Sequence, residues 1–110
     1  MRARLLTFAL LCAASGCATH VGPEGPAVGG RCVDEFDCAA GSFCLGEYPD
    51  GTCTRNCGSA GDCPGGSTCI DYRGGVCLLP CTSAGECREG YVCAERTKVD
   101  GARANVCVGP

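Results

Sequence analysis

Apolar residues are concentrated at the start of the chain and become sparse afterwards. Residues 5–14 form an apolar stretch of ten residues, which is far too short to cross a bilayer as a helix. The stretch follows a short positive segment, residues 1–4, and precedes the small pair Ser15-Gly16. This order is typical of a signal peptide. We therefore expect residues 1–16 to be a leader that is removed on export.

From Cys32 onward the pattern of residues repeats in three units. Each unit has four cysteines, with five residues in each of its first two intervals. The third interval holds eight, seven and thirteen residues in turn, and three residues separate successive units. The units span residues 32–53, 57–77 and 81–107. A repeat of this kind decides the architecture before any single motif does.

Other positions repeat with the cysteines. An acidic residue precedes the second cysteine, at Asp37, Asp62 and Glu86. A glycine follows that cysteine by three positions, at Gly41, Gly66 and Gly90. A β-branched residue precedes the fourth cysteine, at Thr52, Val76 and Val106. We expect the acid to cap a turn, the glycine to need positive φ or close approach, and the β-branched residue to lie in a strand. Turn residues between the third and fourth cysteines then predict one short β-hairpin in each unit, with the longest loop in the third.

Composition indicates what holds such a chain together. Fourteen of 110 residues are cysteine, above the roughly 8–10% that marks a disulfide scaffold in a short exported chain. There is no tryptophan, and there are only three phenylalanines and three tyrosines. Large apolar residues are too few for a conventional core, so disulfides must supply the stability. The predicted fold class is small and disulfide-rich: three tandem four-cysteine units with short β-hairpins, many turns and little regular secondary structure.

The pairing of the cysteines is not determined by their spacing, because four cysteines allow three connectivities. We expect each unit to close internally, first to third and second to fourth, since each holds a complete even set. The expected bridges are Cys32–Cys44, Cys38–Cys53, Cys57–Cys69, Cys63–Cys77, Cys81–Cys93 and Cys87–Cys107. Each would contribute about 2–4 kcal/mol on the chain-entropy model.

The sequence Ala14-Ser15-Gly16-Cys17 resembles the lipobox of bacterial lipoproteins, although Ala14 stands where that family usually has leucine. The resemblance implies cleavage before Cys17 and lipidation of its thiol. Ordinary cleavage at the same place, followed by secretion, is the alternative. Cysteine parity favours lipidation: without Cys12 and Cys17, twelve cysteines remain, and an even number can pair completely. By resemblance to enterobacterial lipoproteins, Ala18 after the anchor implies export to the outer membrane.

Residues 17–31 are expected to be the lipidated cysteine and a tether. Glycine and proline dominate residues 18–31 and no apolar period occurs, which is typical of a flexible linker. Such a linker would span roughly 20 Å. The chain's one histidine, His20, lies in this stretch, where it has no oriented partner for catalysis.

The spacing of the units resembles the cysteine-rich tandem modules of bacterial surface lipoproteins. It also resembles parts of the Dickkopf/colipase-like and whey-acidic-protein modules of animals. It departs from the animal modules because no two cysteines are adjacent and each unit is shorter. Those modules bind receptors, lipases or proteases. None of their binding residues can be placed here, so the resemblance implies only an architecture.

Charge and spacing argue against several chemistries. The net charge is −3, and −5 once residues 1–16 are removed, with no basic run, so no nucleic-acid partner is expected. The short cysteine spacings that zinc sites use occur only between units, at 53–57 and 77–81. The units contain neither a histidine nor a C-x-x-C pair. We expect no metal, no cofactor and no enzymatic activity.

The function expected from these features is that of an exported, membrane-anchored binding or structural module of the cell envelope. Three units would form a rigid rod at the outer membrane or cell surface, with an unknown protein or surface ligand as partner. The longest loop, residues 94–106, offers Arg96, Lys98 and Arg103 as candidate binding residues. The alternative is a secreted protease inhibitor or ligand-type module, in which one of these basic residues enters a trypsin-like pocket.

Overall fold

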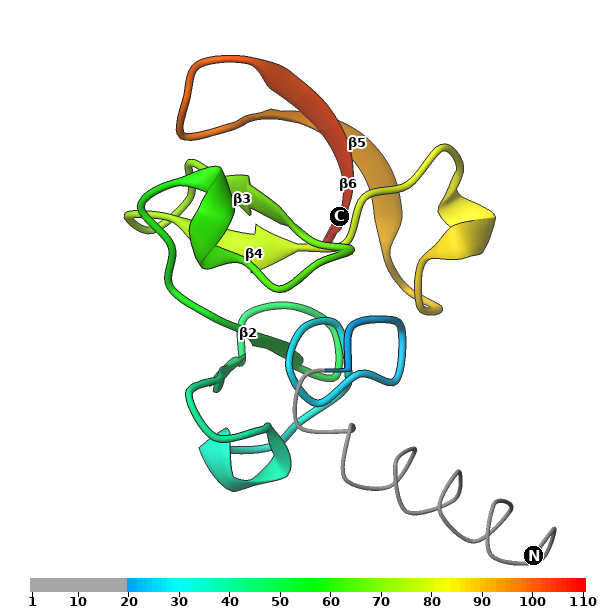
Figure 1. The fold of residues 1–110 in the computed structure, drawn as a ribbon. Coiled ribbons are helices and arrows are strands. Elements are labelled where there is room, and N and C mark those ends of the chain that lie inside the picture. Colours follow the sequence, from blue (N-terminus) through cyan, green and yellow to red (C-terminus); the bar gives the residue numbers. More distant parts are fainter. Residues whose placement is uncertain (1–19) are drawn as a thin grey trace, which may run out of the picture.

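The three units fold alike, each as one turn of 3-10 helix followed by a two-stranded antiparallel hairpin. The computed structural model describes residues 20–110 (Figure 1), so the leader and Cys17 lie outside the described residues. Unit 1 (residues 32–53) forms η2 (Glu35–Asp37), β1 (Phe43–Leu45) and β2 (Thr52–Thr54). Unit 2 (residues 57–77) forms η3 (Ala60–Asp62), β3 (Thr68–Ile70) and β4 (Val76–Leu78). Unit 3 (residues 81–107) forms η4 (Ala84–Glu86), β5 (Val92–Thr97) and β6 (Arg103–Val108). The second strand of each unit extends one residue beyond the unit's last cysteine, and that residue is counted with its unit. The small disulfide-rich class predicted from the sequence is confirmed.

Six disulfides join the cysteines first to third and second to fourth in every unit. The bridges are Cys32–Cys44, Cys38–Cys53, Cys57–Cys69, Cys63–Cys77, Cys81–Cys93 and Cys87–Cys107. They are the pairs expected from the sequence. In each hairpin the third and fourth cysteines lie directly opposite one another, and opposite residues of an antiparallel pair share a face. Two bridges therefore fasten the 3-10 turn and its flanks to one face of the hairpin.

The repeated acid and glycine have the local roles predicted for them. The Oδ2 atoms of Asp37 and Asp62 accept the backbone N–H of Val33 (2.7 Å) and Gly58 (2.8 Å), respectively. Glu86 accepts the N–H of Thr82 in the same way at 2.6 Å. The three glycines after the second cysteine have φ angles of +87°, +90° and +91°, a region that residues with a Cβ rarely adopt.

The flexible tether predicted for residues 18–31 is wrong for residues 20–31, which we call the N-terminal segment. Val28 in this segment is 1% exposed. The Gly29 N–H donates to the Cys53 oxygen, and the Cys53 N–H donates to the Gly30 oxygen, both at 2.8 Å. The same bond recurs in the other units, where Cys77 donates to Arg55 (3.0 Å) and Cys107 to Leu79 (2.8 Å). Each hairpin thus takes the residue two positions before its unit as an added backbone partner, and such an interaction leaves no side-chain pattern in the sequence.

The rod-like arrangement expected for the units is also wrong, because unit 3 folds back onto unit 1. Arg88 of unit 3 is only 8% exposed. Its Nε donates to the Gly29 oxygen (3.1 Å) and its Nη2 to the Tyr91 hydroxyl (2.9 Å) and to the Gly51 oxygen. The Tyr91 hydroxyl in turn donates to the Pro49 oxygen at 2.9 Å. One buried arginine therefore docks two units that are far apart in the sequence.

A small aliphatic core joins units 2 and 3. It consists of Ile70, Val76, Leu78, Val106 and Val108, all at most 3% exposed. The Asp71 N–H donates to the Thr97 oxygen at 2.8 Å, so the end of β5 lies along the end of β3. Figure 1 shows unit 1 at the lower end of the molecule, with units 2 and 3 above it. The three units therefore meet at one junction rather than in a row.

Candidate binding site at the junction of the three units

A groove of about 760 Å³ opens where the three units meet. Its floor is formed by the buried side chains of Ile70, Leu78 and Val108. Its walls include Tyr48 from unit 1 and Arg96 from unit 3. The volume falls within the roughly 300–1,000 Å³ of small-ligand sites, and an apolar floor with a few polar groups is their usual composition.

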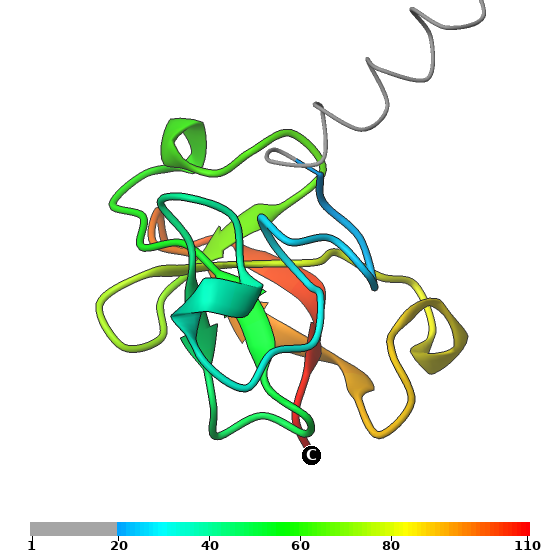
Figure 2. The same ribbon diagram turned by 90° about the horizontal axis from the view of Figure 1, so that it is seen from below.

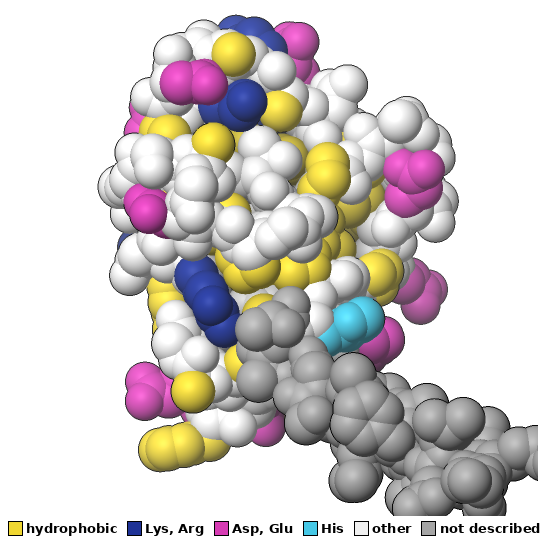
Figure 3. All heavy atoms as spheres, viewed as in Figure 1, with side chains coloured by type: hydrophobic (Ala, Val, Ile, Leu, Met, Phe, Trp, Pro, Cys, Tyr) yellow, Lys and Arg dark blue, Asp and Glu magenta, His cyan; other side chains and the backbone are white. Residues whose placement is uncertain are grey.

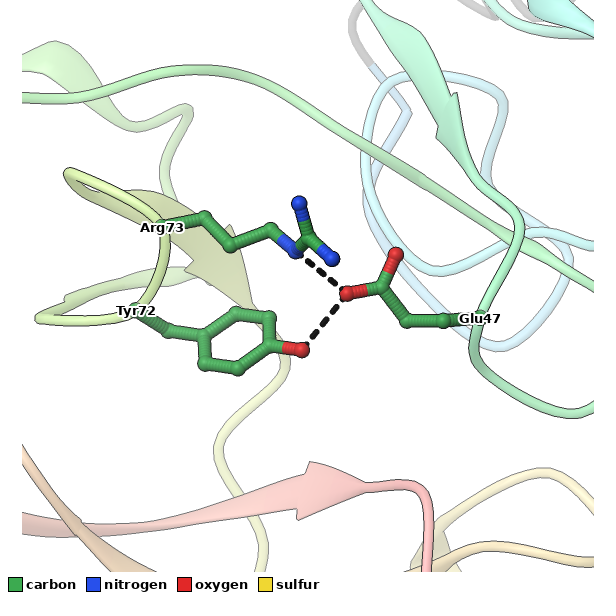
Figure 4. Close-up of polar contacts among 3 residues, drawn as sticks. All are labelled: Glu47, Tyr72 and Arg73. Atoms are coloured by element: carbon green, nitrogen blue, oxygen red, sulfur yellow. Dashed lines mark hydrogen bonds and ion pairs between the residues drawn. The ribbon is translucent and has the colours of Figure 1, made fainter.

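Glu47 and two tyrosines build one side of this groove. The rings of Tyr48 and Tyr72 are stacked, with centroids 6.0 Å apart and planes inclined by 30°. The Tyr72 hydroxyl donates to Glu47 Oε2 at 2.6 Å, and Arg73 Nε donates to the same oxygen (Figure 4). The Tyr72 hydrogen bond, followed by the hydrogen bond and charge of Arg73, lowers the pKa of Glu47. Glu47 is therefore anionic at neutral pH and fastens unit 1 to unit 2.

Tyr48 lies at the centre of this arrangement. Its ring also meets Tyr91 edge-on, with centroids 5.9 Å apart. Burial, followed by the charge of Tyr72, raises the pKa of Tyr48, so its hydroxyl stays protonated and can donate to a ligand. All three tyrosines of the chain thus gather at the junction of the units.

The structure does not bring the three basic residues predicted as binding residues together. Arg96 lies in β5 on the groove wall, and its Nη1 donates to the Glu95 oxygen at 3.0 Å. Arg103 lies in β6, opposite Thr97 and therefore on the other face of the hairpin, with its Nη2 3.2 Å from Glu95 Oε1. Lys98 Nζ is 3.6 Å from Asp100 Oδ2. Only Arg96 belongs to the groove.

The long third loop is not a free loop. Most of it is strand, and Lys98 forms a β-bridge to Ile70 of unit 2. β5 and β6 pair with each other in a two-stranded sheet, so the basic residues of this segment are displayed on a paired hairpin. The inhibitor alternative stays a prediction.

Three cysteine sulfurs approach one another in each unit as closely as the ligands of one metal ion would. The sulfurs of Cys32, Cys38 and Cys53 lie within 4.8 Å of one another, and both other units repeat this grouping. All of these cysteines are in disulfides, and a cysteine that ligates a metal must be a thiolate. The grouping therefore reflects two adjacent bridges.

Sequence reasoning missed the polar and aromatic residues on one side of this groove, namely Glu47, Tyr48, Asp71 and Tyr72. A signal was present: Tyr48 and Tyr72 stand in the equivalent loops of units 1 and 2, in a chain with few aromatic residues. Their meeting depends on how the units dock, which the repeat does not encode.

Comparison with family models, with curated proteins and with solved structures finds no match to this chain. Within residues 20–110 there is no helix long and apolar enough to cross a membrane. The six disulfides are typical of an exported protein, because such bonds persist in oxidising compartments.

Proposed function

We propose that this protein is an exported, non-enzymatic binding module, anchored in the outer membrane or at the cell surface through lipid on Cys17. The observation that carries the anchor is the complete pairing of the cysteines from Cys32 to Cys107. None of them needs the thiol of Cys17, so an unlipidated Cys17 would be an unpaired thiol in an oxidising compartment. Lipidation would convert this free thiol to a thioether, and it is also the modification that the lipobox-like sequence before Cys17 implies.

The binding function is supported by the groove at the unit junction. Disulfides fix the fold of each unit that contributes to it, so the side chains of the groove lose little conformational freedom when a ligand enters. Tyr48 supplies an apolar face with a polar tip, and Arg96 supplies a charged donor. The partner is a surface ligand or an exposed segment of another protein.

A binding role is better supported than an enzymatic one. A general acid in a groove of this kind needs a carboxyl with a raised pKa. The Tyr72 hydrogen bond instead lowers the pKa of Glu47, so this carboxylate is a structural clamp. It holds the groove together and stays deprotonated near neutral pH.

The anchor is tested by the intact mass of the protein purified from membranes, before and after reduction. Lipid mass on an N-terminal Cys17 and a gain of two hydrogens for each of the six disulfides are expected. A soluble species without lipid would refute the anchor.

The groove is tested by screening a defined panel of oligosaccharides and peptides against the wild-type protein and two variants. Arg96→Ala changes the groove wall, whereas Arg103→Ala changes the other face of the same hairpin. A ligand of the groove should be lost in the first variant and retained in the second. If a ligand binds Arg96→Ala as tightly as it binds the wild-type protein, or if no member of the panel binds, the groove is not the binding site.

A further inference from the structure

Unit 1 exposes two apolar side chains to solvent. Val33 is 90% exposed and Phe36, in η2, is 88% exposed. Figure 3 shows a hydrophobic side chain projecting from the lower end of the molecule, where unit 1 lies. A single exposed hydrophobic residue needs no explanation, but here two occur in the same turn.

The repeat supplies an internal control for these two residues. Units 2 and 3 have Gly58 and Thr82 where unit 1 has Val33, and Gly61 and Gly85 where it has Phe36. All three turns nevertheless form the same 3-10 helix after an extended residue, with an acid accepting from the backbone. The fold therefore does not need Val33 or Phe36, and their exposure points to an outside partner.

The position of this turn relative to the lipid anchor proposed at Cys17 indicates which partner it meets. Because the N-terminal segment is folded, only residues 18 and 19 separate Cys17 from it, and three Cα–Cα steps span at most about 11 Å. The segment packs beside the residues that follow η2, where the Ala39 N–H donates to the Pro26 oxygen and Ser42 Oγ to the Ala27 oxygen, each at 2.8 Å. Val21, at the start of the segment, faces Gly66 of unit 2. A lipid on Cys17 would hold this end of the molecule against the bilayer.

The three 3-10 turns point in different directions when the molecule is seen from the unit 1 end (Figure 2). Only η2 lies in front in that view, whereas η3 and η4 lie toward the sides. We propose that the η2 turn is a membrane-contact tip, in which Val33 and Phe36 enter the headgroup region of a zwitterionic lipid surface. This inference rests on the proposed anchor.

The charges of the turn specify the lipid. Asp34, Glu35 and Asp37 lie in it, and Arg31 is the one basic residue close by in the sequence. Two of the three carboxylates bond to the turn's own backbone: Asp34 accepts from Phe36 (2.9 Å) and Asp37 from Val33 (2.7 Å). Anionic lipids would repel this turn, whereas the ammonium groups of zwitterionic lipids can pair with its carboxylates.

Two apolar side chains bind a bilayer weakly by themselves. The anchor makes their insertion an intramolecular event with a high effective concentration, so a weak contact becomes populated. The tip would then fix the orientation of the protein on the membrane.

The chain has no tryptophan, so one can be introduced as a reporter of depth. Phe36→Trp is compared with Gly61→Trp, the same position in the unit 2 turn, where a Cβ would meet no atom within 4 Å. Each lipidated variant is placed in phosphatidylcholine–phosphatidylethanolamine vesicles with brominated acyl chains. We expect F36W to show blue-shifted emission that the bromines quench, and G61W to show neither. Replacing half of the lipid with phosphatidylglycerol should reduce the F36W quenching.

Equal quenching in both variants, or none in F36W, would overturn the tip while leaving the anchor intact. That is also the outcome expected if the turn binds a protein. If the mass of the protein shows no lipid, the anchor fails, and the tip is then tested separately. Unlipidated F36W and G61W are coupled through Cys17 to a maleimide lipid, and the same comparison of quenching decides.

Discussion

Arg88→Ala is expected to undock unit 3 from unit 1. The guanidinium donates to the buried Gly29 and Gly51 oxygens and to the Tyr91 hydroxyl, and it lies 4.8 Å from the centre of the Tyr91 ring. A hydrogen bond from a charged group contributes about 1.5–3 kcal/mol. Water that enters the vacated space replaces part of three such bonds. We therefore expect the free energy that docks unit 3 onto unit 1 to fall by about 3–4 kcal/mol.

Native-state hydrogen exchange measures this loss of docking free energy at the backbone amides of Gly29 and Gly51. The disulfides remain in the variant, so the units themselves should stay folded while the contact between them opens. The Gly29 amide, bonded to the Cys53 oxygen, and the Gly51 amide, bonded to the Tyr48 oxygen, should then exchange about a hundredfold faster or more. Arg88→Lys keeps the charge but lacks the planar fork and should lie between the wild type and alanine.

Arg73→Ala is the matched control. This arginine also contacts unit 1, through Glu47, but its side chain is 62% exposed. An exposed ion pair contributes about 0–1 kcal/mol, so the same amides should change by less than about tenfold. If Arg88→Ala accelerates exchange no more than Arg73→Ala does, a single buried arginine is not what docks the units.

Three further results are expected. The pKa of Glu47 is lowered. The stabilisation that its carboxylate gives to the contact between units 1 and 2 is therefore present above the ordinary glutamate range, and it is lost as pH falls through the lowered pKa. Exchange at the junction should therefore accelerate at acidic pH in the wild type but not in Glu47→Gln, and equal pH profiles would contradict this. Gly75→Ala should block oxidative refolding, because φ is +116° and a Cβ would lie 1.9 Å from a backbone oxygen. Gly74→Ala (φ +84°), with no atom that close, should refold, and similar refolding yields from the two would be contrary evidence. Replacing Cys63 and Cys77 with serine opens a loop of sequence separation 14 and should cost about 3 kcal/mol in a denaturant titration, whereas an unchanged midpoint would contradict it.

The units could be predicted from the sequence because each repeated residue encodes a local conformation. Asp62 caps its own turn, Gly66 supplies a positive φ, and Val76 lies in a strand. These effects act within a few residues, so they survive in a one-dimensional pattern. The lipid anchor, by contrast, stays a prediction, because Cys17 lies outside the described residues.

The docking of the units could not be predicted because it depends on residues that do not repeat. Arg88 follows the second cysteine of unit 3, where units 1 and 2 have Ala39 and Pro64. The N-terminal segment was misread because glycine and proline are typical of linkers, although here they allow close backbone approach. A Cβ at Gly29 would lie 2.2 Å from the Gly22 oxygen, so a composition that suggested flexibility instead permits a tight fold.

Positions at which the three units differ therefore indicate how the units dock and what they contact, which the repeated positions do not. A position filled alike in all three units is accounted for by the shared turn and hairpin. Positions filled differently include residues that join the units and residues that lie exposed on the surface. Arg88 is buried and joins units, whereas Phe36 is exposed and replaces a glycine that serves the same turn elsewhere. Substituting each departing residue with its counterpart from another unit would thus separate folding from binding, since the replacement is already known to fit the turn.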